Sequence, residues 1–455
     1  MKTEDLNRLA DRILKENHFL FMDGGFFLYQ NGVFRPQEDA DIKKIIKKKL
    51  GMFSNIRSIE EISNALSIEC AKKRAQLPVQ KEYVNVMNGM IELRTGKLVD
   101  HSAAFFSTFQ LPVNYIKGEK CQRFMSAVQE WLEESEKIQL LQEYLGYCLL
   151  PFTDQEKILF LLGDGANGKS TLIKVIKAVF GSENCSFIPL DRMKDRFNLA
   201  GLRGKAINFS PEVASDDQLC DSLVKSIVSG DDVLAEEKYK PPFYLTPTAK
   251  LIVACNDMPY SKDKSHATDR RLLILKFNRS FSDRCCDKEL GQKLIAEKDG
   301  IFSWILKGLK QLCARGHFKE PQESGQEREN YRKECNPVLS FVEGHCEVGP
   351  LFSVSKGGLY REYRNFCESA GRNPVSINKF GKELRRHYSV LDDMGMANGR
   401  RARLWIGIKL VTEVETYFFE SVETEVDINK ATGVDGDKLL DDLLTTTNER
   451  IVKII

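Results

Sequence analysis

Several features of membrane, secreted and metal-stabilised proteins are missing from this chain of 455 residues. There is no run of about 18 apolar residues, so we expect no transmembrane helix. The first 17 residues alternate charged and apolar side chains and lack the apolar core of a signal peptide. The 12 cysteines include no C-x-x-C pair, which argues against a structural zinc site. We therefore expect reduced thiols and a cytoplasmic location.

A large excess of charge of one sign is also missing. Lys and Arg number 67 and Asp and Glu 65, a net charge of +2 that argues against a strongly basic nucleic-acid coat. This near-zero net charge arises, however, because a basic region and an acidic region of the chain cancel each other. Residues 355–409 contain 12 Lys/Arg against 5 Asp/Glu, and residues 411–455 contain 4 against 11. We expect a local nucleic-acid surface in the basic module, which the acidic tail could cover in competition with DNA.

The length is about three times that of a usual domain, and the ordinary share of apolar residues, 42%, excludes a wholly disordered chain. Breaks in composition predict five segments. They are a mainly helical region with a hairpin (1–80), a small β and helical domain (81–150), an α/β domain (151–335), a compact helical unit ending in short strands (336–410) and the acidic tail (411–455).

Turn dipeptides and apolar periodicity predict the structure upstream of the α/β domain. Two apolar runs around Gly-Gly predict a hairpin over 18–29, and the Asn-Gly at 31–32 supplies a second turn. Turn pairs within 88–96 predict a small β unit, and an apolar stripe predicts one or two helices over 124–150. Five lysines within 43–49 form either a solvated helix face or a nucleic-acid contact.

Residues 163–170, Gly-Asp-Gly-Ala-Asn-Gly-Lys-Ser, fit the phosphate-loop pattern G-x-x-x-x-G-K-[S/T]. Its glycines let backbone N–H groups surround phosphates, Lys169 neutralises phosphate oxygens, and Ser170 offers a hydroxyl to Mg²⁺. An apolar strand is expected before the loop, over 158–162, and a helix after it, over 171–180. The pattern predicts a site for ATP and Mg²⁺. Its nucleotide-binding residues are Gly163, Asp164, Gly165, Ala166, Asn167, Gly168, Lys169, Ser170 and Thr171.

Such a site needs an acid at the end of a second strand, which orders the metal and the attacking water. Glu212 is the first candidate, because it follows a short apolar strand over 206–209. Asn208 interrupts that strand and weakens its pattern. Asp216 and Asp217 are the alternatives, although they lie in a polar run typical of a helix start.

Two further strands end or begin with polar residues. Asn256 follows a strand over 251–255 and either orients the lytic water or is a turn residue. Arg270 and Arg271 precede a strand over 272–275. An arginine at such an edge is either a salt-bridge partner or a group that stabilises transition-state charge across a subunit boundary.

Taken together, these motifs resemble the superfamily 3 helicases, in particular the phage/plasmid and poxvirus-type primase-helicase branch. The resemblance is strong over 157–281 and extends over roughly 80–410. It implies an α/β fold with a P-loop AAA+-like ATPase core, an α-rich N-terminal region and a C-terminal winged-helix domain. It also implies catalytic roles for Lys169 and for Glu212, the acid that would bind the metal and the attacking water. Asn256 would be the sensor and Arg271 the arginine finger, with Arg270 as the second candidate for the finger.

The same resemblance assigns DNA contacts. Residues 237–243 resemble the hairpin that would carry Lys238 and Tyr239 into a ring channel, with Lys240 close by. Residues 374–386 resemble a turn and recognition helix with Ser376 as its N-cap, and 399–403 a wing. The basic residues there either contact DNA or form a solubilising face. They are Lys379, Lys382, Arg385, Arg386, Arg400 and Arg401.

The implied function is an ATP-dependent DNA helicase of a phage, plasmid or virus replication system, acting in the host cytoplasm. It would form a homo-oligomeric ring, a hexamer, and move 3′ to 5′ on single-stranded or forked DNA beside a separate primase or polymerase, with no membrane partner. The first 80 residues are too few for a polymerising primase domain. The alternative is an ATP-dependent origin-binding or loading protein without processive unwinding; a small-molecule kinase is disfavoured because no acceptor-binding lid motif is visible.

Overall fold

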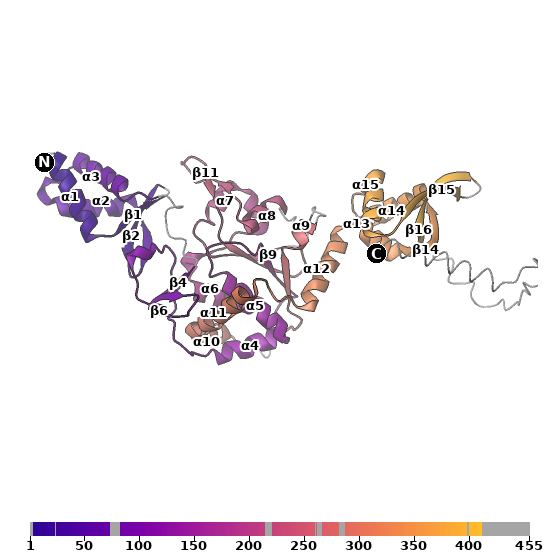
Figure 1. The fold of residues 1–455 in the computed structure, drawn as a ribbon, viewed down its shortest axis with the longest axis horizontal. Coiled ribbons are helices and arrows are strands. Elements are labelled where there is room, and N and C mark those ends of the chain that lie inside the picture. The colour runs from indigo at the N-terminus through magenta and orange to yellow at the C-terminus, as the bar shows by residue number, and fades with distance from the viewer. Residues whose placement is uncertain are drawn as a thin grey trace, which may run out of the picture. The chain divides into compact units, whose positions relative to one another are not determined.

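The computed structural model describes residues 3–22, 24–72, 82–213, 221–259, 261, 266–281, 287–397 and 400–411. It divides into two compact units, Met1–Pro337 and Val338–Ile455 (Figure 1). The first three predicted segments therefore share one unit. The acidic tail after Val411, and the covering role suggested for it, lie outside the described residues. Among the helices that are described, none combines the length and apolar character needed to cross a bilayer.

The N-terminal region packs three helices against a three-stranded antiparallel sheet. The predicted hairpin and the second turn are confirmed, because the second strand pairs with both of its neighbours. In the second helix, Lys43 and Lys44 pair with Asp39 and Asp41 of the same helix, which favours the solvated face. The elements are α1 (Thr3–Glu16), β1 (Phe19–Met22), β2 (Gly25–Gln30), β3 (Val33–Gln37), α2 (Asp39–Leu50), η1 (Gly51–Phe53) and α3 (Ile56–Glu69).

A small β unit and two helices follow, as the turn pairs and the apolar stripe predict. Phe124, Val128 and Trp131 of the predicted stripe are all buried. The chain breaks into two helices near Glu133, which has a positive φ of 60°. The elements are β4 (Tyr83–Val86), β5 (Gly89–Glu92), β6 (Leu98–Val99), η3 (Ala103–Phe105), α4 (Gln122–Leu132) and α5 (Ser135–Tyr147).

The centre of the first unit is a five-stranded sheet in the order β13-β7-β12-β9-β8. All its pairings are parallel, so every strand ends at the same edge. This arrangement confirms the predicted α/β class. The strands are β7 (Ile158–Leu162), β8 (Cys185–Ser186), β9 (Ile207–Val213), β12 (Lys250–Cys255) and β13 (Leu272–Lys276).

Alternate residues of the strands enter two different cores, one on each face of the sheet. Leu159 and Leu161 face the core built with α4, α5, α6 (Lys169–Phe180), α10 (Leu290–Ile295) and α11 (Lys298–Arg315). Ile158 and Phe160 face the core built with α7 (Arg196–Ala200), α8 (Asp221–Ser229) and α12 (Gln322–Cys335). Figure 1 shows helices on both faces of the sheet. The sheet is therefore buried on both faces, which explains its nearly continuous apolar strands.

Two glycines allow α5 and α11 to pack closely beneath the sheet. A Cβ on Gly146 would lie 2.4 Å from the backbone nitrogen of Leu309. A Cβ on Gly308 would lie 2.3 Å from the carbonyl oxygen of Gln142. Any larger residue at either position would push the two helices apart.

Two expectations for this unit need correction. Strand β9 runs to Val213, so Asn208 does not interrupt it and Glu212 lies within the strand. The buried Asn208 amide is satisfied by Ser186 Oγ at 2.9 Å and by both the N–H and the carbonyl of Ile188, each at 2.9 Å. The segment 320–334 is highly charged and carries no core pattern, which predicts a linker helix or a boundary. It does form a helix, α12, but this helix packs on the sheet and is not a free linker. It covers the edge strand β13, where Ile274 N–H donates to Ser324 Oγ at 3.1 Å.

Short elements connect the sheet strands. They are η4 (Ser182–Asn184), η5 (Leu190–Lys194), β10 (Val233–Ala235), β11 (Phe243–Leu245) and α9 (His266–Asp269).

The second unit packs helices against the antiparallel sheet β14-β16-β15. Phe341, Tyr363, Phe380 and Trp405 are among its core residues. Ser376 occupies the predicted N-cap position, but its side chain makes no capping hydrogen bond. The elements are α13 (Pro337–His345), β14 (Cys346–Ser355), α14 (Lys356–Ser369), α15 (Ile377–His387), β15 (Leu391–Ala397) and β16 (Arg400–Leu410).

Candidate nucleotide and DNA sites

The glycine-rich loop 163–170 joins β7 to α6 at the carboxyl edge of the central sheet. Two of its glycines have positive φ angles, 150° for Gly163 and 95° for Gly168. A Cβ on Gly163 would lie 2.6 Å from the carbonyl oxygen of Phe277, and one on Gly168 would lie 2.7 Å from the Trp131 ring. The loop therefore forms a cradle whose shape only glycine permits at these two positions.

Lys169 lies at the first turn of α6 and bends back over the loop. Its ammonium donates hydrogen bonds to the carbonyl oxygens of Gly163 and, at 3.1 Å, of Asp164. The residue is 8% exposed, and burial lowers its pKa, although the nearby Cys255 and Asp164 oppose the shift. An anion bound in the cradle would give this cation a charged partner. The cradle and its lysine thus fit a phosphate group.

The segment after β13 supports the loop from the side. Phe281 N–H donates to the Ala166 carbonyl at 2.8 Å, and Ser280 Oγ donates to the Gly165 carbonyl at 3.3 Å. Asn167 is 3% exposed, and its amide donates to the Asp164 carbonyl. No sequence signal singled out Phe281 or Ser280, because their contacts exist only in the folded sheet.

The register of the sheet aligns three of the predicted site positions. Cys255 pairs with Leu162 on one side and with Val213 on the other. Gly163 and Asn256 directly follow this row, and Glu212 directly precedes it in β9. Asn256 is exposed, as is Ser170, whose hydroxyl is available for Mg²⁺. The Glu212 side chain, and all of Asp216 and Asp217, lie outside the described residues.

The two arginines before β13 lie at the opposite, amino edge of the same sheet. Arg271 Nη2 lies 2.8 Å from Glu156 Oε2 and donates to Ser229 Oγ at 2.8 Å, and its side chain is 11% exposed. Arg270 Nη2 lies 3.3 Å from the same carboxylate oxygen, but its side chain is 66% exposed. Glu156, which the sequence patterns did not single out, thus binds both arginines.

The segment 237–243 connects β10 to β11, which pair antiparallel and form a hairpin. Lys238 and Tyr239 lie at its tip, and Tyr239 is fully exposed with a positive φ of 65°. Lys240 is also exposed, but its ammonium lies 2.7 Å from Glu237. The hydrogen bond from Lys240 lowers the pKa of Glu237, and Arg203 pairs with the same carboxylate at 3.0 Å. Lys238 and Tyr239 are therefore the residues best placed to meet a ligand.

The second unit carries the predicted basic face on α15. Lys379, Lys382, Arg385 and Arg386 are all exposed, on the side opposite the buried Phe380 and Leu384. Arg385 also lies 5.3 Å from the Trp405 ring centre and 3.8 Å from Asp392. Arg401 is exposed on β16, whereas the Arg400 side chain lies outside the described residues.

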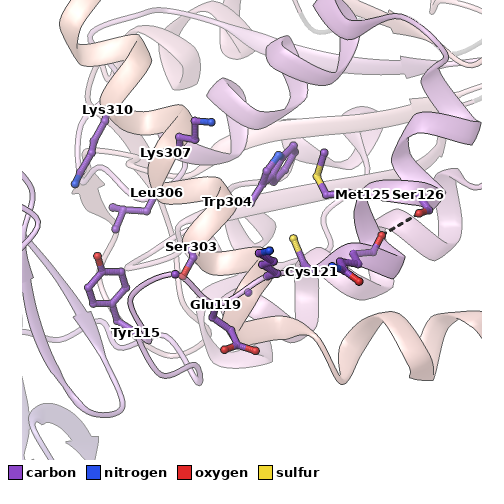
Figure 2. Close-up of a pocket in the computed structure, with 14 residues that line it drawn as sticks. Tyr115, Glu119, Cys121, Met125, Ser126, Ser303, Trp304, Leu306, Lys307 and Lys310 are labelled. Atoms are coloured by element: carbon purple, nitrogen blue, oxygen red, sulfur yellow. Dashed lines mark hydrogen bonds between the residues drawn. The ribbon is translucent and has the colours of Figure 1, made fainter.

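A separate pocket of about 800 Å³ lies between α4 and α11. Figure 2 shows Trp304 next to Met125, and Lys307 and Lys310 on the same helix as Trp304. None of its lining residues belongs to the glycine-rich loop. The cradle, the lysine and the aligned strand ends all occur at the loop and not in this pocket.

Comparison with known families gives three partial matches. A family described as "D5 N terminal like" matches residues 4–135, a family of unknown function (DUF5906) matches residues 161–271, and the RFX DNA-binding domain matches residues 336–401.

Curated relatives come from large DNA viruses. The chain is 24% identical over 321 residues to "Putative helicase L207/L206" of Acanthamoeba polyphaga mimivirus, covering 62% of this chain and 32% of that protein. It is 28% identical over 163 residues to "Putative helicase 184R" of Invertebrate iridescent virus 6, covering 33% of this chain and 16% of that protein. It is 22% identical over 240 residues to "Putative primase C962R" of African swine fever virus, covering 50% of this chain and 25% of that protein. The chain thus spans about a third or less of these relatives.

Among solved structures, the fold is shared with the apo structure of the NrS-1 C terminal region, at a TM-score of 0.55 and 12% identity. The match covers 88% of this chain and 98% of that one. Together with the D5 N terminal like match, the viral relatives relate this chain to the D5-like primase-helicases.

Proposed function

We propose that the chain is the ATP-hydrolysing motor of a replicative DNA helicase of superfamily 3, with a P-loop AAA+-like core and a C-terminal winged helix. The observation that carries the proposal is the loop 163–170, a glycine cradle with Lys169 folded over it at the strand ends of a parallel sheet. A phosphate-binding loop between a strand end and a helix start is the arrangement by which P-loop enzymes bind ATP. The names of the viral relatives agree with this function.

In this proposal each residue has a defined task. Lys169 would leave the loop carbonyls and bind the terminal phosphates, and Asn256 would orient the attacking water. Ser170 and Glu212 would hold Mg²⁺, which supplies charge neutralisation on the phosphates when bound. Gly163 and Gly168 keep the backbone close enough to donate N–H groups to the phosphates.

The position of the arginines supports assembly of several copies. Arg270 precedes β13 at the amino edge of the sheet, whereas the loop follows β7 at the carboxyl edge. Strands of this length place the two edges about 20 Å apart. An arginine on that edge cannot serve the loop of its own chain, so it would complete the site of a neighbouring copy, as in a ring. The hairpin tip with Lys238 and Tyr239 would then face the channel and move single-stranded DNA, 3′ to 5′ by resemblance.

The test is ATP hydrolysis with and without single-stranded DNA, together with strand displacement on a forked duplex. We expect DNA to stimulate hydrolysis, displacement to require ATP, and Lys169→Ala to abolish both. Mass measurement of the complex with a non-hydrolysable ATP analogue would report the ring, for which we expect six copies.

A second function is favoured by the match of residues 336–401 to the RFX DNA-binding domain. It is an ATP-dependent origin-binding or loading protein, whose basic face on α15 would contact duplex DNA. Intact hydrolysis without any strand displacement, combined with tight binding to a particular duplex sequence, would favour this loader over the helicase.

A further inference from the structure

The pocket between α4 and α11, here called the α4–α11 groove, has no role in the proposed motor. Its volume is about 800 Å³. Gly300, Ser303 and Lys307 line it from α11 at helical spacing, and Gln122 and Ser126 line it from α4 in the same way. Residues three or four apart lie on the same face of a helix. Each helix therefore turns one continuous face to the groove.

The loop before α4 closes the third side of the groove and is fixed on α11. A Cβ on Gly300 would lie 2.4 Å from the Lys120 carbonyl oxygen, so the loop and the helix are in close contact there. Ser303 Oγ donates to the Ile116 carbonyl at 3.5 Å, and the Tyr115 ring packs edge-on against Phe302, with 6.4 Å between ring centres. The groove is thus part of the packed domain.

The interior of the groove is apolar. Tyr115, Met125 and Trp304 are half-buried and line it, and Trp304 lies next to Met125 (Figure 2). The Trp304 ring is held edge-on against the buried Phe124, with 5.3 Å between ring centres. Aromatic and methionine side chains are enriched at protein interfaces, and methionine adapts its shape to the ligand. The groove therefore offers a surface on which apolar side chains can pack.

Positive charge surrounds this apolar surface. Lys120, Lys307 and Lys310 line the groove and are exposed, and none of the three has an ion-pair partner among the residues that the structure describes. Glu119 is the one acid in the lining. The charge is therefore largely uncompensated, and the groove suits a ligand that combines apolar groups with negative charge.

The DNA strand at the hairpin is not placed to be this ligand. Val233 and Leu245 of the hairpin strands belong to the core on one face of the central sheet. The groove helices α4 and α11 belong to the core on the other face. A strand that meets Lys238 and Tyr239 would thus lie across the sheet from the groove.

The chain itself contains a segment of the required chemistry. Residues 412–427 carry six Asp/Glu (413, 415, 420, 423, 425 and 427) and no Lys or Arg, around the run Tyr417-Phe418-Phe419. This segment lies outside the described residues. Its acids complement the lysines of the groove, and its rings complement the apolar interior. The basic face of α15 complements only the acids, because Phe380 and Leu384 of that helix are buried.

We propose that the α4–α11 groove binds residues 412–427 of another copy of the chain. The three aromatic rings pack on Trp304 and Met125, and the flanking acids lie beside the three lysines. In an assembly of several copies, this contact would tie neighbouring copies together. The binding itself does not depend on ATP hydrolysis, so it stands apart from the proposed motor.

The test measures binding of a fluorescent peptide with the sequence of residues 412–427 by anisotropy. The protein is the full chain carrying Phe418→Ser and Phe419→Ser, so that its own segment does not compete. We expect the peptide to bind, and Lys307→Glu with Lys310→Glu to weaken binding by about tenfold or more, because both exposed side chains would then repel the acids. A peptide with serine in place of its three aromatic residues should also bind about tenfold or more weakly.

The matched control is Lys379→Glu with Lys382→Glu, which makes the same change of charge on the exposed face of α15. This pair should leave peptide binding unchanged. Hydrolysis without DNA should be the same in all these variants, which separates the inference from the motor proposal.

Four outcomes would overturn the inference. Absence of peptide binding is the first. If the α15 pair weakens binding and the groove pair does not, the acidic segment covers the basic module instead. If the serine peptide binds as well as the original, charge alone is responsible. If the groove pair weakens binding of oligo(dT) but not of the peptide, the groove is a DNA site.

Discussion

Glu156 Oε2 lies 2.8 Å from Arg271 Nη2, and this pairing separates the two candidate arginine fingers. Arg271 is nearly buried on Glu156 and Ser229, whereas Arg270 is mostly exposed. We therefore expect Arg270→Ala to lower kcat for ATP hydrolysis by about 10³-fold or more in the assembled ring, with Tm unchanged. Arg271→Ala should instead lower the free energy of unfolding by about 1–3 kcal/mol, because it removes a largely buried partner of Glu156.

Paired measurements of kcat and Tm check this assignment. Asp154→Asn is the control for charge near Glu156, because Asp154 is exposed and only two residues away. A variant Arg271→Ala that keeps its Tm but loses hydrolysis would restore Arg271 as the finger, as the family resemblance implies.

The loop glycines provide a second prediction. Gly168→Ala should abolish nucleotide binding, because its Cβ would lie 2.7 Å from the Trp131 ring at a φ of 95°. Gly165→Ala is the matched control, since a Cβ there would meet nothing within 4 Å. Binding of a fluorescent ATP analogue measures both. An equal loss of affinity for the ATP analogue in the two variants would mean that the packing of Trp131 on Gly168 does not determine nucleotide binding.

Local sequence patterns predicted the apolar strands, the glycine-rich loop and the N-terminal hairpin, because each depends on apolar periodicity or turn residues close together in the chain. They failed where distant segments meet. Asn208 weakened the expected strand, yet its amide is fully bonded by the neighbouring segment that contains Ser186 and Ile188. No local rule reveals such a partner, because it lies about twenty residues earlier in the sequence.

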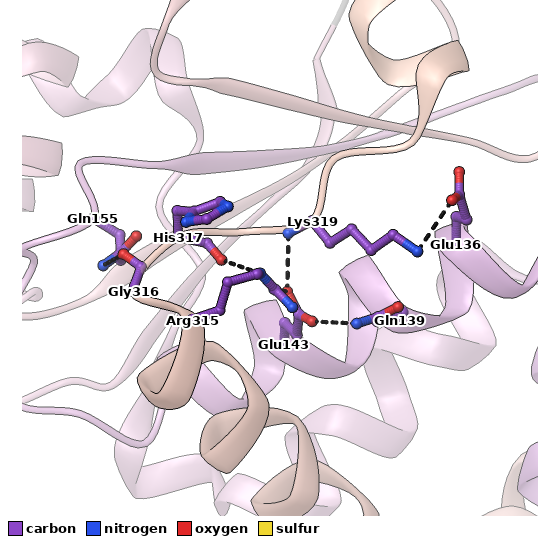
Figure 3. Close-up of polar contacts among 8 residues, drawn as sticks. All are labelled: Glu136, Gln139, Glu143, Gln155, Arg315, Gly316, His317 and Lys319. Carbon is purple, nitrogen blue, oxygen red and sulfur yellow. Dashed lines mark hydrogen bonds and ion pairs between the residues drawn. The ribbon is translucent and has the colours of Figure 1, made fainter.

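The buried Glu143 of α5 illustrates the same limit. It is 0% exposed and accepts hydrogen bonds from Arg315, from Gln139 at 2.8 Å and from the backbone of Lys319 at 3.2 Å (Figure 3). In the sequence it is an ordinary charged residue on an amphipathic helix. Two of the three donors, Arg315 at the end of α11 and the Lys319 backbone after it, are more than 170 residues away in the sequence, and they allow the charge to be buried.

The hairpin tip gives a third prediction. Lys238→Ala should strongly reduce strand displacement while hydrolysis without DNA continues, because Lys238 is exposed and would contact the phosphate backbone. Lys240→Ala should have a smaller effect, since the Lys240 ammonium is already paired with Glu237 at 2.7 Å. A forked-duplex assay with parallel hydrolysis rates measures both. If Lys238→Ala unwinds like the wild type, the hairpin is not the DNA contact.

Lys250 gives the last prediction, which concerns stability and pH. The residue is 2% exposed at the start of β12, and its ammonium donates to the carbonyls of Leu150 and, at 3.0 Å, of Thr248. Burial lowers its pKa from 10.5 to about 8. Between these two values the unfolded chain binds more protons than the folded one, so the contribution of Lys250 to stability rises with pH. Below about pH 8 the ammonium is charged in both states, and the full cost of burying it is present.

We therefore expect the stability of the wild type relative to Lys250→Met to increase by about 2 kcal/mol between pH 7.5 and pH 9.5. Urea unfolding under reducing conditions measures this difference. A Trp405→Phe background limits the fluorescence signal to Trp131 and Trp304, both of which belong to the first unit. Burial raises the pKa of the Cys148 thiol and of the Tyr147 phenol, so both stay neutral in the folded state of either protein. Their ionisation in the unfolded state is common to both proteins and cancels in the comparison. A difference that stays constant over this pH range would mean that Lys250 keeps its ordinary pKa in the folded protein.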